Sequence, residues 1–131
     1  MDDARRADVG LWLKKAREDL AVVRLVIAGR GPSPVACFLC QQAAEKFLKA
    51  VLVAAGVDPP YVHDLDLLAR LIAEAGCALD IDPDALLSLR AYAVAPRYPG
   101  FPDDQADRDL DRLLGLAESV EAAVVAAIAR L

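Results

Sequence analysis

Aromatic residues, histidine and cysteine are scarce in this 131-residue sequence, and each scarcity excludes a class of protein. Aromatic residues make up only 5%, so the apolar side chains are mostly Ala, Leu and Val, which favours closely packed helices. Three cysteines, an odd number, provide no disulfide framework, and we therefore expect a reducing compartment. His63 is the only histidine, which leaves little material for a histidine-based metal or catalytic centre.

An excess of positive charge and a long apolar run are also absent. The net charge of −5 argues against general polyanion binding, which rests on a basic footprint, and leaves only a local basic patch open. The N-terminal stretch MDDARRADVG has no apolar core and is not a secretory signal, and no apolar run approaches the roughly 18 residues of a membrane helix. We expect a cytoplasmic protein that does not enter a membrane.

Turn-forming residues divide the chain into five segments with helical periodicity, and none shows the strict alternation of a strand. The pattern predicts helices near 8–28, 34–55, 64–75, 84–95 and 103–130. Long helices with short connections predict an all-α fold, an antiparallel up-and-down helical bundle of four to five helices. The length fits a single domain, 1–131.

The second predicted helix is apolar over half of its surface or more, so it needs cover on two sides. We expect one cover to be its own bundle and the other to be a second subunit, with Ala43 and Ala50 near the centre of that interface. Two carboxylates lie on apolar stripes of other helices. Asp19 is expected at a rim in water, with a basic partner as the alternative, and Glu121 needs a partner or an exposed turn.

Cys37 and Cys40 form a C-x-x-C motif. A structural zinc site needs four ligands, but Cys77 stands alone and no second pair exists. Both cysteines fall on the apolar side of their helix, which predicts small buried thiols packing between helices. We therefore expect neither a metal nor another cofactor.

Motifs of hydrolases and phosphate-binding loops are missing as well. Two features remain unexplained: the polar side of the second helix, and the segment YAVAPRYPGF, which holds Tyr92, Arg97, Tyr98 and Pro99. This segment is a rigid turn closing the bundle or part of a ligand site.

The stretches ACFLCQQAAEKFLKAVLVAAG, HDLDLLARL and LRAYAVAPRYPG, in this order, resemble the HEPN (higher eukaryotes and prokaryotes nucleotide-binding) domain family. WLKKAREDLAVVRLVI fits the opening helix of that family. The resemblance covers roughly residues 8–130 and implies a four- or five-helix bundle that forms a homodimer. It also implies a partner, a minimal nucleotidyltransferase, in toxin–antitoxin-like pairs.

Many members of the wider family are metal-independent RNases with an Arg-x4–6-His motif, and this sequence lacks it. Gly56, Val57 and Asp58 stand at the required distances before His63, and no histidine follows Arg90 or Arg97. The family's loop often has an acidic or neutral residue before Arg-Tyr-Pro, where this chain has Pro96. We therefore expect a protein that is not an enzyme. The alternatives are an RNase toxin without the usual motif, and an interaction protein that only seals the nucleotidyltransferase interface.

The expected ligand is a nucleotide, another phosphate-bearing molecule or RNA. Its candidate site combines the polar side of the second helix with the loop and the start of the third helix. The residues are Phe38, Gln42, Glu45, Lys46, Lys49, His63, Arg97 and Tyr98. Phe38 would stack on a base and Arg97 would hold phosphate. The competing interpretation is a solvated, self-paired face, because Glu45 and Lys49 form a favourable i,i+4 pair.

Overall fold

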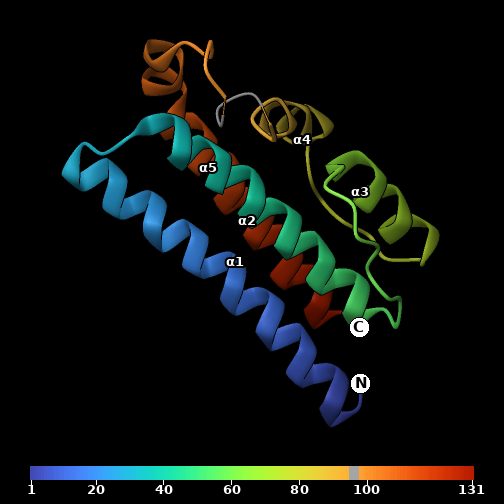
Figure 1. Ribbon diagram of the computed structural model, residues 1–131. Helices are drawn as coiled ribbons and strands as arrows, with labels where there is room; N and C mark the ends of the chain where they lie inside the picture. Colours follow the sequence, from blue (N-terminus) through green and yellow to red (C-terminus); the bar gives the residue numbers. More distant parts are fainter. Residues whose placement is uncertain (95–97) are drawn as a thin grey trace.

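The computed structural model describes residues 1–94 and 98–131, and in these ranges it contains five helices and no strand. The helices are α1 (Asp3–Gly29), α2 (Ser33–Ala54), α3 (Leu65–Glu74), α4 (Pro83–Arg90) and α5 (Asp103–Ala129) (Figure 1). The predicted all-α fold is confirmed. Two bounds differ from the prediction by more than one residue. α1 begins at Asp3 because the Asp2 carboxylate accepts a hydrogen bond from the Arg5 N–H at 2.7 Å and caps the helix. α4 ends at Arg90, earlier than expected.

α2 lies at the centre, with α1 on one side, α5 behind it, and α3 and α4 on the side away from α1 (Figure 1). α1 runs antiparallel to α2, as expected for an up-and-down bundle. α5, however, runs in the same direction as α2. Near their starts the Cys37 thiol donates to the Ala106 carbonyl oxygen at 3.6 Å, and near their ends Ile128 packs beside Ala50 and Ala54. The chain between α2 and α5, which includes α3 and α4, returns to the starting end.

The chain itself covers α2. Fourteen of its 22 residues are buried, and Ala43 and Ala50 are fully so. The expectation that Ala43 and Ala50 lie near the centre of a subunit interface is therefore wrong, because the other helices of the same chain already cover these two residues. The predicted homodimer itself stays a prediction.

Cys37 and Cys40 are fully buried in the main core, as predicted. Burial, the larger cause, and nearby carboxylates raise the pKa of the Cys37 thiol to about 12. Burial likewise raises the pKa of the Cys40 thiol to about 12. Within the described ranges no group of three or more His, Cys, Asp or Glu side chains is arranged to hold a metal ion. No helix in those ranges is long and apolar enough to cross a membrane.

Candidate functional site

Both carboxylates on apolar stripes have basic partners from other helices. Asp19 of α1 accepts a hydrogen bond from the Lys46 ammonium of α2 at 2.7 Å. The expectation that Asp19 meets only water is wrong, and the alternative is confirmed. Glu121 of α5 accepts a hydrogen bond from the Arg17 guanidinium of α1 at 2.8 Å. These pairs tie α1 to its two long neighbours.

Glu45 is the centre of the polar contacts on α2. Its carboxylate lies 3.2 Å from the Lys49 ammonium and 2.9 Å from Nδ1 of His63. Glu45 and Lys49 are only 4% and 6% exposed, so this side of α2 is not the solvated face of the competing interpretation. The i,i+4 spacing produces the pair as expected, but it lies inside the protein.

Two neighbouring elements bury this pair. Trp12 of α1 covers Lys49, whose ammonium lies 5.6 Å from the centre of the indole ring, a cation–π contact. On the other side, the Gln41 side-chain amide donates to the His63 carbonyl oxygen at 3.4 Å. Asp64 then caps α3 by accepting from the Asp66 and Leu67 N–H groups, so His63 is free to contact Glu45.

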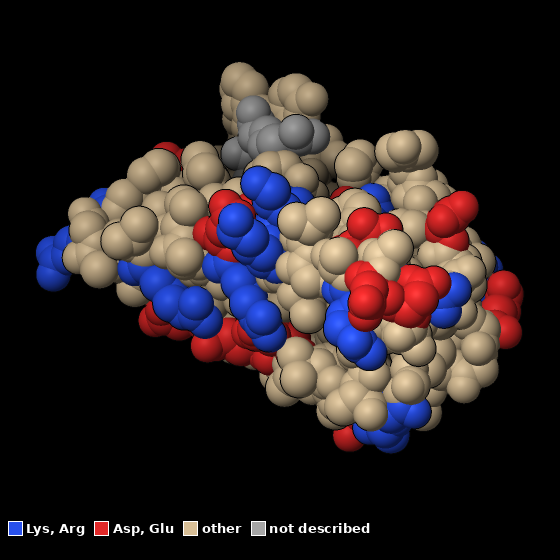
Figure 2. Space-filling model, turned by 90° about the horizontal axis from the view of Figure 1, so that it is seen from below, with Lys and Arg blue, Asp and Glu red and all other residues tan. Residues whose placement is uncertain are grey.

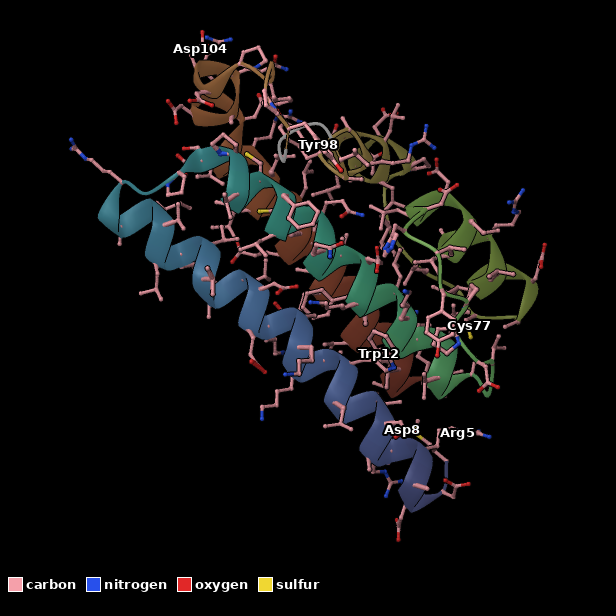
Figure 3. The ribbon with its side chains drawn as sticks, viewed as in Figure 1. Arg5, Asp8, Trp12, Cys77, Tyr98 and Asp104 are labelled. Carbon is pink, nitrogen blue, oxygen red and sulfur yellow. The ribbon has the colours of Figure 1, made fainter. Side chains whose placement is uncertain are left out.

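A cavity of about 620 Å³ opens beside Lys49 and Trp12. It lies between the start of α1, the end of α2 and the segment 56–61. Figure 3 shows Arg5, Asp8 and Trp12 on the side of α1 that faces the end of α2. The lining residues are Asp2, Ala4, Arg5, Asp8, Trp12, Lys49, Val53, Gly56, Val57, Asp58, Pro59, Pro60 and Tyr61.

The Arg5 guanidinium lies against the turn that ends α2. Gly56 has a φ of +81°, a conformation that favours glycine, and a Cβ placed there would lie 3.3 Å from Arg5 Nη2. A cation at this place also suits the negative end of the α2 dipole. Among the residues that the structure describes, Arg5 forms no ion pair within 4 Å. Its charge is therefore available to a ligand in the cavity.

The charge around the cavity is mixed. Arg5 and Lys49 supply two cations, and Asp2, Asp8 and Asp58 supply three carboxylates. Figure 2 shows the molecule from below, the end at which α1 begins, with acidic and basic side chains interspersed. Such an arrangement does not attract polyanions in general. It suits a small ligand that has an anionic group together with hydrogen-bond donors.

The structure brings together three of the predicted site residues, Glu45, Lys49 and His63. Lys46 pairs with Asp19, whereas His63 contacts Glu45, so these two site residues do not share a partner. The others are half-buried on α2 or exposed: Phe38 and Gln42 are half-buried and Tyr98 is exposed. Arg97 lies outside the described residues. The convergence of Lys46, Arg97, Tyr98 and His63 therefore stays a prediction.

Sequence reasoning missed the part of the cavity that α1 contributes. The first helix was expected to begin at residue 8, which left Arg5 outside it. The signal was present in Asp2, an N-cap residue three positions before Arg5. The segment 56–60 was recognised as a turn, but nothing in the sequence pairs Gly56 with Arg5.

Two solved structures share this fold over nearly the whole chain. The crystal structure of TT1696 from Thermus thermophilus is 27% identical and has a TM-score of 0.73, covering 88% of this chain and 94% of that one. ST0689, described as an archaeal HEPN homologue, is 26% identical with a TM-score of 0.68, covering 92% and 97%. No curated protein matches the sequence. The profile of the HEPN domain family matches residues 9–127. The chain belongs to the HEPN domain family.

Proposed function

We propose that this HEPN domain binds a nucleotide or another small phosphate-bearing ligand in the cavity beside Trp12. The observation that carries the proposal is the Arg5 guanidinium, which lines the cavity and has no ion-pair partner among residues 1–94 and 98–131. A guanidinium in this state offers paired N–H donors to phosphate oxygens. The sequence-predicted site is thus extended toward the N-terminus of α1.

The remaining lining side chains support a nucleotide over a bare anion. Lys49 also lines the cavity next to Trp12, although its charge is paired with Glu45. Both Trp12 and Tyr61 have ring faces on which a base can stack. Asp8 and Asp58 are acceptors for amino or hydroxyl groups of a base and a ribose. Three carboxylates would repel a ligand that consists of phosphate alone, so a base should contribute to affinity.

Calorimetric titration with AMP, ATP and inorganic phosphate tests this proposal. We expect the nucleotides to bind and Arg5→Ala to weaken them by about tenfold or more, the loss of about 1.4 kcal/mol that one charge-assisted hydrogen bond accounts for. Arg6→Ala is the matched control, since Arg6 is exposed, pairs with Asp3 and does not line the cavity. Equal affinities of the Arg5 and Arg6 variants would contradict the cavity as the site.

The same titration separates the cavity from the site predicted by sequence. Lys46→Ala and Arg97→Ala should leave binding unchanged if the ligand occupies the cavity. Loss of binding in both variants, with intact thermal stability, would instead place the ligand at the loop before α5.

A separate assay tests for RNA cleavage, and we expect no cleavage. Cleavage that disappears in Arg97→Ala would support the alternative, an RNase without the usual motif.

We further propose that the protein acts as a homodimer with a minimal nucleotidyltransferase, in a toxin–antitoxin-like pair. Exposed apolar side chains on and after α4 support a partner surface: Leu87, Val94 and Tyr98 are 55%, 56% and 60% exposed. Co-expression with a nucleotidyltransferase encoded beside this chain should yield a complex that Leu87→Glu weakens. A complex that survives this change would exclude this surface.

A further inference from the structure

The outer face of α1 is exposed along its whole length and is largely apolar. Leu11, Val22 and Leu25 are 59%, 44% and 71% exposed. The opposite face of the helix carries its buried residues, Val9, Ala16, Leu20 and Val23. α1 lies at the edge of the molecule, and Figure 1 shows no helix over its outer face.

Eight residues of this face recur with the spacing of a coiled coil, at the a and d positions of successive heptads. Ala4, Leu11, Glu18 and Leu25 occupy one position, and Ala7, Lys14, Ala21 and Ala28 occupy the other. All eight are exposed, and six of them are apolar. We call this set the α1 stripe. It extends about 36 Å along the helix, at 1.5 Å per residue.

We propose that the α1 stripe packs antiparallel against the α1 stripe of a second copy of this chain. This inference takes up the homodimer of the proposed function and names its surface. The two charged residues of the stripe select the orientation. In the antiparallel pairing centred between Lys14 and Glu18, residue i faces residue 32 − i of the other copy, so each Lys14 faces a Glu18. A parallel pairing would place Lys14 against Lys14 and Glu18 against Glu18, which is unfavourable.

The same pairing matches the sizes of the apolar side chains. Leu25 faces Ala7 and Leu11 faces Ala21, so each large residue meets a small one, and Ala4 meets Ala28. This alternation lets facing side chains interdigitate. No further shift between the two helices is needed: the register that pairs Lys14 with Glu18 also places each leucine opposite an alanine. A two-fold axis through the middle of α1 therefore satisfies charge and shape together.

A shallow hollow of about 270 Å³ lies at the edge of the stripe, lined by Asp8, Leu11, Trp12 and Lys15. In the antiparallel pairing, Leu25 of the second copy faces Ala7, between Ala4 and Leu11 and beside this hollow. Val22 of the second copy lies next to Leu11. The pairing thus removes Leu11 and Leu25, the two most exposed leucines of α1, from contact with water. Lys15, which pairs with Glu18 at 3.7 Å within one chain, stays at the rim.

Sedimentation tests the surface first. At micromolar concentration we expect a species of twice the 14.0 kDa chain mass. Leu11→Glu and Leu25→Glu should each remove it without changing the helical circular dichroism, because both side chains are exposed. Leu87→Glu is the matched control, an exposed leucine on α4 that should leave the dimer intact.

Exchange of charges tests the pairing itself. The Lys14→Glu chain carries two carboxylates at the centre of the stripe and the Glu18→Lys chain carries two ammonium groups, so each alone should be monomeric. Mixed in equal amounts, they should form a heterodimer, detected by native mass spectrometry. The double variant Lys14→Glu/Glu18→Lys should dimerise again, since each carboxylate then faces an ammonium.

Disulfide cross-linking tests the orientation, in a Cys77→Ser background. Ala4→Cys/Ala28→Cys should form covalent dimers, and Ala4→Cys alone should not. Cross-linking of Ala4→Cys alone would indicate a parallel pairing and overturn the proposal. If the wild type dimerises and both leucine variants still do, the stripe is not the interface although the homodimer stands. A monomeric wild type would exclude both, while the nucleotide titration would still report on the cavity.

Discussion

Glu45 is the residue on which the polar contacts of the site depend, because its carboxylate contacts both Lys49 and His63. We predict that Glu45→Ala lowers the free energy of unfolding by about 3 kcal/mol, since the Lys49 ammonium then stays buried under Trp12 without a carboxylate. Urea unfolding measures the change. Glu74→Ala, at an exposed position on α3, should cost less than about 0.5 kcal/mol.

A second variant distinguishes the ion pair from general loss of packing. In Glu45→Ala/Lys49→Met no charge is left buried, so we expect part of the lost stability to return. A double variant as unstable as the sum of the two single variants would show that the pair is not coupled.

The buried thiols of Cys37 and Cys40 make stability depend on alkaline pH. Their pKa values are raised from 9.0 to about 12 in the fold, so the folded chain holds these protons more tightly than the unfolded chain. Their contribution is complete below about pH 9 and is lost as pH rises toward 12. We predict that the free energy of unfolding falls over this range, and that Cys37→Ala/Cys40→Ala reduces the slope. Equal slopes in urea titrations of the two proteins would contradict this assignment.

At the scale of the elements, the turns that end α2 and α3 offer a matched pair of glycines. Gly56 and Gly76 have φ angles of +81° and +82°, but only Gly56 has Arg5 against it. We predict that Gly76→Ala costs about 1–2 kcal/mol of backbone strain and Gly56→Ala costs more, because the new methyl group also displaces the guanidinium. Thermal unfolding measures both. The excess should disappear in an Arg5→Ala background, and an excess that persists there would have another cause.

At the scale of the whole molecule, α2 and α1 should respond in opposite ways to a new charge. Ala43 is fully buried inside one chain, so Ala43→Arg should unfold the protein and not merely separate two subunits. An exposed position such as Leu11 should instead change association and leave the fold intact. Circular dichroism and sedimentation on both variants check this contrast. If the Ala43→Arg protein is folded and monomeric while the wild type is a dimer, α2 would be part of the subunit interface.

The sequence by itself determined the helices and much of what they bury. Periodicity and turn residues are local signals, so five helices, the central apolar α2 and the buried Cys37 and Cys40 were all predictable. The heptad spacing of the α1 stripe is also in the sequence. It indicates a contact surface only once the structure shows that the opposite face of α1 is the buried one.

Only the tertiary structure decided what each polar group meets. Asp19 and Lys46 are 27 residues apart, Glu45 and His63 are 18 apart, and Arg17 and Glu121 are 104 apart. No spacing rule within one helix links such residues, because their contact depends on how α2 packs between its neighbours. The same packing covered α2 without a second subunit and placed Arg5 at the turn of Gly56. The candidate cavity is a product of that packing, since its walls come from three segments that only the folded chain brings together.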